Sequence, residues 1–516
     1  METTSRSLMS IENVTNADWS SGRHIHDPFV RKSLSTIDYC LFAAMLTLSA
    51  LIGVYFAFFA KKKQNTTSEY LMGGKNMGVT PVAMSLISSY ISGITLLGMP
   101  AEIYTYGTQY CAILIGLLGA SCVNGFFFVP LFYQLQLNSS YEYLQIRFDR
   151  NVRLLGSILY LISSLLYIPI VIYMPALASS QVTGINLHLI TPLLCIGGLK
   201  AVVWTDVLQT TMMFGAVLVV VGIGTNAIGG VGVVWERSEA SGRIELFNFD
   251  PNPTIRHTFW STAFGSIFGW CTSFSVNQSL VQRFLAMSSM GRAKILVIIF
   301  SVGTFFITAI SFYVGLLVYA YYHDCDLVLS KAVRASDQIF PYFVMDVTEN
   351  LPGLPGLFMA GVFSAALSTM STGLNSMSGV IYEDFIRPFR KVPLSEERAS
   401  CLMKFICVII GVFCFGMVFA VENLGAANQL AESMAGITNG PLLAIFVLGM
   451  FFPWANAKGT LAGGITGLIA MGYISFGTQA AMSSGQIKFE KKPASIEGCP
   501  FLPNDTFTTM HVMTAT

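Results

Sequence analysis

Runs of about twenty apolar residues recur along most of the chain and are separated by short polar segments. A helix rises about 1.5 Å per residue, so a run of this length can cross the roughly 30 Å hydrocarbon core of a bilayer. The pattern predicts an all-α polytopic membrane protein with about twelve transmembrane helices. The expected spans are 38–60, 77–105, 109–135, 152–178, 185–198, 199–229, 259–286, 293–322, 354–383, 400–421, 427–452 and 458–480.

The fifth span, 185–198, is shorter than the others. Its fourteen residues make about 21 Å of helix, and Pro192 interrupts it. The basic clusters that follow nevertheless lie on the expected side of the membrane only if the chain crosses here. We therefore expect a crossing, but a strained one.

Composition supports a membrane protein and excludes several other classes. Charged residues make up 11% of the 516 residues, against about 25% in soluble domains. The formal net charge of +1 argues against a nucleic-acid partner. The chain lacks a phosphate-binding Walker loop and an HExxH motif, so neither an ATP-driven pump nor an enzyme is expected.

The distribution of basic residues predicts the orientation. Lys61, Lys62 and Lys63 follow the first span directly and are expected in the cytosol, which puts the N-terminus outside. Residues 1–37 then form an extracellular N-terminus that does not resemble a cleaved signal peptide. Residues 38–480 form the transmembrane domain, and 481–516 form an extracellular tail.

This topology sorts the cysteines and the glycosylation sequons. Cys325 and Cys499 are the two of the ten cysteines in segments assigned to the oxidising side, so a disulfide between them is expected. Asn13 and Asn504 are expected to carry glycans. The other three sequons are not, because Asn65 and Asn138 are cytosolic and Asn277 is inside a span.

Two spans are unusually rich in serine, threonine and glycine. These residues lie between Ser85 and Thr95 in the second span and between Ser261 and Asn277 in the span 259–286. Such stretches can unwind at membrane depth where they line a cavity, and the freed carbonyl oxygens can then bind an alkali cation. Close packing of helices through small residues is the alternative.

A stripe of hydroxyl side chains runs along the span 354–383. Ser364, Ser368, Ser371 and Thr372 are three or four residues apart, and Thr369 lies beside them. Na⁺ prefers oxygen ligands, so this stripe is a candidate sodium site when it faces unwound backbone. Alternatively, the hydroxyls bond back to the carbonyls of their own helix.

Acidic residues within the spans are costly and are therefore functional candidates. Asp206 lies two turns inside its helix, with a structural tie to a cytosolic loop as the alternative. Glu102 and Glu432 lie near span ends, where an interfacial position is equally compatible with the pattern. His188 and His257 are interpreted as loop or interface residues.

Several segments together resemble the sodium:solute symporter family, in particular its multivitamin and monocarboxylate transporter branch. The resemblance runs from about residue 34 to 480. It is carried by Ser68–Gly78, Ser85–Tyr104, Gly197–Asp206, Arg256–Trp260, Val276–Arg283, and Leu354–Phe358 with the stripe that follows. It implies a LeuT-like inverted-repeat core with one extra N-terminal helix, and alternating access driven by Na⁺.

The resemblance also implies roles for individual residues. The sodium site would use the carbonyls of Ser88, Ile91 and Ala365 and the hydroxyls of Ser368 and Thr369. Asp206 and Gln209 would support it from nearby. Candidate solute-binding residues are Tyr90, Ser92, Thr95, Asn277 and Glu432. Sugar-transporting relatives carry a glutamine at the position of Glu432. An ionised glutamate there would repel an anionic solute.

The chain departs from the family in two places. The resemblance implies that about nine residues would be missing before Gly197 and that the family's last transmembrane helix would be absent. The expected function is Na⁺ symport of a monocarboxylate or a vitamin-like carboxylate of the biotin or pantothenate type at the plasma membrane, with Na⁺ as coupling ion and no cofactor. The alternatives are a transport-inactive truncated form that associates with a full-length relative, or a symporter of iodide or sugar.

Overall fold

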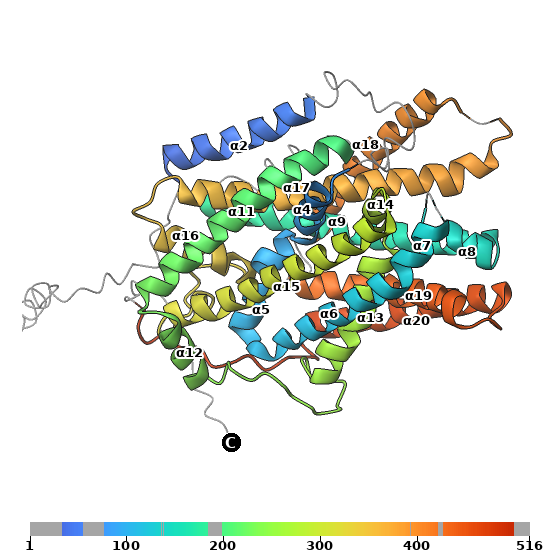
Figure 1. The fold of residues 1–516 in the computed structure, drawn as a ribbon. Coiled ribbons are helices and arrows are strands. Elements are labelled where there is room, and N and C mark those ends of the chain that lie inside the picture. The colour runs from blue at the N-terminus through green and yellow to red at the C-terminus, as the bar shows by residue number, and fades with distance from the viewer. Residues whose placement is uncertain are drawn as a thin grey trace, which may run out of the picture.

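A computed structural model describes residues 34–54, 77–135, 137, 139–183, 199–392, 394–421 and 427–499. These residues are helical and contain no strand (Figure 1). Short π-helical or 3₁₀ turns connect several of the helices. The helices are α2 (Thr36–Val54), α4 (Val79–Tyr90), α5 (Met99–Tyr106), α6 (Ile113–Val123), α7 (Val129–Leu135), α8 (Glu142–Arg147), α9 (Arg150–Thr183), α11 (Leu199–Ala227), α12 (Val231–Ala240), α13 (Ser266–Cys271), α14 (Gln278–Leu285), α15 (Met290–Tyr321), α16 (Ile339–Val347), α17 (Leu354–Val380), α18 (Glu396–Val421), α19 (Ala427–Phe451) and α20 (Ala457–Ser483).

Eight helices in the described part of the chain are long and apolar enough to span a membrane, and a bent pair makes a ninth. The expected span 185–198 lies outside the described residues, and so does the end of the first span. The count of twelve therefore stays a prediction. The last helix continues to Ser483, past the expected boundary at 480.

The second expected span is broken, as its composition predicts. It consists of Val79–Tyr90 and Ile94–Tyr106, which meet at an angle of 58°. The backbone is unwound at Ile91 and Ser92, where Ile91 is extended. A Cβ on the following Gly93 would lie 2.5 Å from the Cβ of Met174, so glycine allows this segment to approach α9 closely.

The span 259–286 is also broken. It is divided into π-helical turns at Trp260–Gly265 and Thr272–Val276, α13 and α14. Asn277 is extended, and its side chain accepts a hydrogen bond from the backbone N–H of Ser279 at 2.9 Å, which caps α14. Both predictions of unwinding are confirmed.

The broken helices lie inside the bundle. The first half of the bent pair, α4, contacts α11, α15 and α17, while α9 packs against α17, α18 and α19. At the periphery, α18 and α20 leave apolar side chains such as Phe405 and Ile469 exposed. Exposed apolar helix faces of this kind are suited to lipid.

One end of the bundle carries the long loops and the tail, and we call it the loop end. It comprises residues 228–258, 322–353 and 486–499. The tail is held there by backbone hydrogen bonds from Lys492 N to Thr105 O (3.0 Å) and from Asp326 N to Ser495 O (2.8 Å). The structure also contains the expected disulfide between Cys325 and Cys499. The tail therefore forms a strap across the loop end.

Candidate sodium and solute site

The break in α4 faces the hydroxyl stripe on α17. The Thr369 hydroxyl lies 2.9 Å from the carbonyl oxygen of Ser89 and 3.0 Å from that of Ala365. The Ser368 and Ser89 hydroxyls are 3.1 Å apart. The five expected sodium ligands thus lie on two facing segments, with Ser88 and Ile91 buried at the end of α4.

Some hydroxyls of the stripe face α4, as a sodium site requires, and others bond back to the carbonyls of their own helix. Ser371 donates to the carbonyl of Ser368 at 3.2 Å, so it bonds back to its own helix. Thr372 instead lies 3.4 Å from the Ser89 hydroxyl and accepts from Arg283. The stripe therefore contributes some hydroxyls to the interface with α4 and satisfies others within α17.

Asp206 points into the bundle and not toward a loop, so the alternative of a tie to a cytosolic loop is wrong. Its carboxylate accepts a hydrogen bond from the Ser85 hydroxyl at 2.5 Å, and its side chain is fully buried. Gln209, one turn further along α11, is also buried. Asp206 therefore contacts α4, the first half of the broken span, and its helix α11 packs against α4.

Arg283 on α14 ends the segment Val276–Arg283, which resembles the family, but no role was predicted for it. Its guanidinium donates at 2.8 Å to both the Ser85 carbonyl and the Ser89 hydroxyl, and at 2.5 Å to the Thr372 hydroxyl. It also lies 3.7 Å from the Asp206 carboxylate. A basic residue inside an expected span is as costly as an acidic one, and this signal could have identified it.

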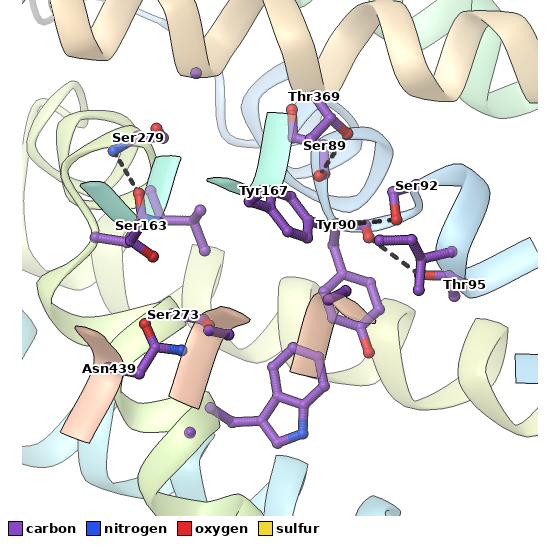
Figure 2. Close-up of a pocket in the computed structure, with 18 of the residues that line it drawn as sticks. Ser89, Tyr90, Ser92, Thr95, Ser163, Tyr167, Ser273, Ser279, Thr369 and Asn439 are labelled. Carbon is purple, nitrogen blue, oxygen red and sulfur yellow. Dashed lines mark hydrogen bonds between the residues drawn. The ribbon is translucent and has the colours of Figure 1, made fainter. Parts of the chain in front are cut away.

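A cavity of about 230 Å³ adjoins the sodium-site candidates, because it is lined by Thr369 and by Ser89, whose carbonyl the Thr369 hydroxyl contacts. The polar side chains around it come from both broken helices, from α9, from α17 and from α19 (Figure 2). All five solute candidates line this one cavity: Tyr90, Ser92, Thr95, Asn277 and Glu432.

Aromatic side chains form one wall of the cavity. The rings of Tyr90 and Trp270 have centroids 5.3 Å apart, and Phe274 extends the cluster. The Tyr90 hydroxyl lies 3.0 Å from that of Thr308, which orients the ring. Sequence reasoning missed Trp270, because an aromatic residue in a span is usually packing.

Glu432 is the one charged residue among the described residues that line this cavity. Its side chain is exposed and lines the cavity, and its depth relative to the membrane interface stays a prediction. Asn439, two turns further along α19, lines the same cavity. A solute in this cavity therefore meets one carboxylate and several neutral polar groups.

Glu102 on α5 is buried within the protein. Its carboxylate accepts two hydrogen bonds from Arg256, at 2.7 and 2.9 Å, and lies 2.7 Å from Nε2 of His257. Burial lowers the pKa of Arg256, but the hydrogen bond and the charge attraction from Glu102, together with nearby tyrosines, outweigh this and raise the pKa overall. His257 is a partner of this buried acid, whereas His188 lies outside the described residues.

The broken helices, the candidate ion site and the adjoining cavity are arranged as in secondary transporters of the LeuT fold. A solved sialic acid symporter has the same fold, with a TM-score of 0.73 at 24% identity over 86% of this chain and 98% of that one. The nucleobase-cation symporter Mhp1 aligns with a TM-score of 0.50 at 13% identity, over 82% of this chain and 96% of that one.

Sequence comparison identifies the family. The model of the sodium:solute symporter family matches residues 70–467, so the chain belongs to that family. Sodium-coupled monocarboxylate transporter 1 of Xenopus laevis is 39% identical over 93% of this chain and 79% of the relative. The sodium-dependent multivitamin transporter of Oryctolagus cuniculus is 39% identical over 88% of this chain and 73% of the relative. The protein is a Na⁺-coupled symporter and not an enzyme.

Proposed function

We propose that the protein takes up a small monocarboxylate or a vitamin-like carboxylate across the plasma membrane, together with Na⁺. The observation that carries this proposal is the polar and aromatic cavity, which shares Thr369 with the expected sodium ligands and is also lined by Ser89, whose carbonyl the Thr369 hydroxyl contacts. The names of the two relatives indicate the same solute class. The membrane potential supplies about 2.3 kcal/mol per Na⁺ at ~100 mV, enough to concentrate a solute.

Binding of an anion in this cavity requires a positive charge that the described cavity lining does not supply. Its described lining contains no lysine, arginine or histidine, and it contains the carboxylate of Glu432. A carboxylate solute therefore needs its positive partner from Na⁺ bound between α4 and α17. This makes binding of the two ligands mutually dependent, which is the requirement for coupled transport.

A neutral polyol or sugar is the second candidate solute. Glu432 favours it, because a carboxylate accepts hydrogen bonds from hydroxyl groups at no cost in charge repulsion. Uptake by oocytes of a panel of carboxylates, sugars and iodide, with and without external Na⁺, separates the candidates. No Na⁺-dependent uptake of any member would favour the transport-inactive alternative.

We expect Ser368→Ala and Thr369→Ala to raise the Na⁺ concentration for half-maximal uptake by about fivefold each. Each change removes one oxygen ligand, a loss of about 1 kcal/mol. Uptake as a function of Na⁺, normalised to surface expression, measures the effect. Ser371→Ala is the matched control, because that hydroxyl bonds to its own helix. Equal Na⁺ dependence in all three variants would reject the site.

We expect glycans on Asn13 and Asn504 and none on Asn65 or Asn138, because the first two are placed outside by the proposed orientation. All four lie outside the described residues. Removing either of the first two asparagines should increase mobility on a gel, as enzymatic deglycosylation does. A glycan on Asn65 would show that the orientation is inverted.

A further inference from the structure

A second cavity, of about 400 Å³, lies at the loop end. Its described lining contains five basic and three acidic side chains, so two positive charges are in excess. The basic residues are Arg243, Arg256, Arg334, Lys491 and Lys492, and the acidic residues are Glu102, Asp326 and Asp337. The solute cavity, in contrast, has no basic residue in its described lining.

The walls of this cavity are fixed by the strap. Arg243 donates to the carbonyl of Tyr104 on α5 and to that of Pro493 in the tail, both at 2.8 Å. Its guanidinium also lies 3.4 Å from the ring centroid of Tyr319. These contacts, with the Cys325–Cys499 disulfide, hold loop and tail against α5.

Most of the charges around the cavity have partners. Arg256 pairs with Glu102, and the Lys492 ammonium lies 3.0 Å from the carboxylate of Glu245. Asp326 is buried and accepts from the Tyr104 hydroxyl at 2.8 Å, and Asp337 is also buried. The three acidic groups are therefore buried, and those of Glu102 and Asp326 are bound to side-chain partners.

Two basic side chains remain available. Arg334 and Lys491 are both exposed and line the cavity from opposite segments, the loop and the tail. Within the described part of the chain, no hydrogen bond or ion pair reaches either side chain. Unpaired cations in a concave site concentrate small anions there.

The second cavity lies next to the solute cavity, because the same two helices, α5 and α19, line both. On α5, Met99 lines the solute cavity and Glu102, one turn further, lines the second one. On α19, Glu432 lines the solute cavity and Gln429 the second. Arg256 donates to Gln429 at 3.2 Å and to Glu102, so this contact lies between the two cavities.

We propose that the second cavity is an anion-binding antechamber, in which Arg334 and Lys491 hold the carboxylate of the solute before it passes Arg256 into the solute cavity. The inference rests on the proposed function, because it takes the loop end as the outer face and a carboxylate as the solute. The expected ligand is a small organic monocarboxylate. Chloride is the inorganic anion that could occupy the same cavity instead.

Cysteine labelling tests the site without requiring transport. Ala494→Cys, which lies on the tail in the cavity lining and keeps both cations, and the control Lys488→Cys, on the same tail but outside the cavity, are purified and reacted with a maleimide, and each peptide is quantified by mass spectrometry. Propionate should slow labelling at position 494 at least about twofold more than NaCl of equal ionic strength. Position 488 should not distinguish the two salts. Equal protection by NaCl at position 494, or no protection, would overturn the proposal.

Uptake then tests the role in transport. Arg334→Gln combined with Lys491→Gln should raise the Michaelis constant for propionate by about two- to fivefold and leave the maximal rate and the Na⁺ dependence unchanged. Lys331→Gln combined with Lys488→Gln removes two exposed charges outside the cavity and is the control. Equal Michaelis constants for propionate in the two double variants would reject the antechamber. Absence of carboxylate uptake by the unmodified chain would refute the proposed function, while the labelling result still decides the anion site.

Discussion

Arg283→Gln should reduce Na⁺-dependent uptake per surface transporter by at least about tenfold. The guanidinium joins α14 to Ser85 and Ser89 on α4 and to Thr372 on α17, and it faces Asp206. Its removal leaves the Asp206 carboxylate buried with the Ser85 hydroxyl and without a basic ion-pair partner among the described side chains. Loss of one partner of a buried charge pair costs about 3–5 kcal/mol, so this variant should also be less stable.

Two further variants separate a role in ion binding from a role in folding. Arg283→Lys keeps the charge but loses the fork that reaches several acceptors, so partial uptake is expected. Arg283→Gln combined with Asp206→Asn removes both charges, which should restore surface expression but not the normal Na⁺ dependence. Normal uptake and normal Na⁺ dependence of the single Arg283→Gln variant would contradict this interpretation.

The parts of the site that sequence predicts are those with a local signature. The unwound segments follow from serine and glycine within apolar runs, since these residues weaken a helix wherever it folds. Asp206 follows from the cost of burying a charge. The Cys325–Cys499 pair follows from the alternation of spans, which leaves these two cysteines alone on one side.

The parts that sequence missed depend on contacts between distant segments. Glu102 and Arg256 are separated by 154 residues, and nothing local to either indicates the other. The two cavities likewise arise from packing of four or more helices and loops. Glu432 was identified as a candidate, but the structure was needed to show that it lines the same cavity as residues of both broken helices.

Glu432→Gln should lower the Michaelis constant for a monocarboxylate by about tenfold or more. Two like charges about 5 Å apart repel by about 3 kcal/mol at an effective dielectric constant near 20, and bound Na⁺ screens part of this. The amide keeps the size and hydrogen-bonding capacity of the side chain and removes the repulsion. Initial rates of propionate uptake at saturating Na⁺ measure the change.

A neutral ligand and a neutral variant isolate the effect of charge. Inhibition of propionate uptake by propionamide should have nearly the same constant in the original chain and in Glu432→Gln, because the amide has no charge to repel. Ser273→Ala removes another polar group from the same cavity and should not produce the anion-specific gain. If Glu432→Gln instead weakens propionate uptake tenfold, the carboxylate binds the solute directly, and the natural solute carries a hydrogen-bond donor or a positive charge at that position.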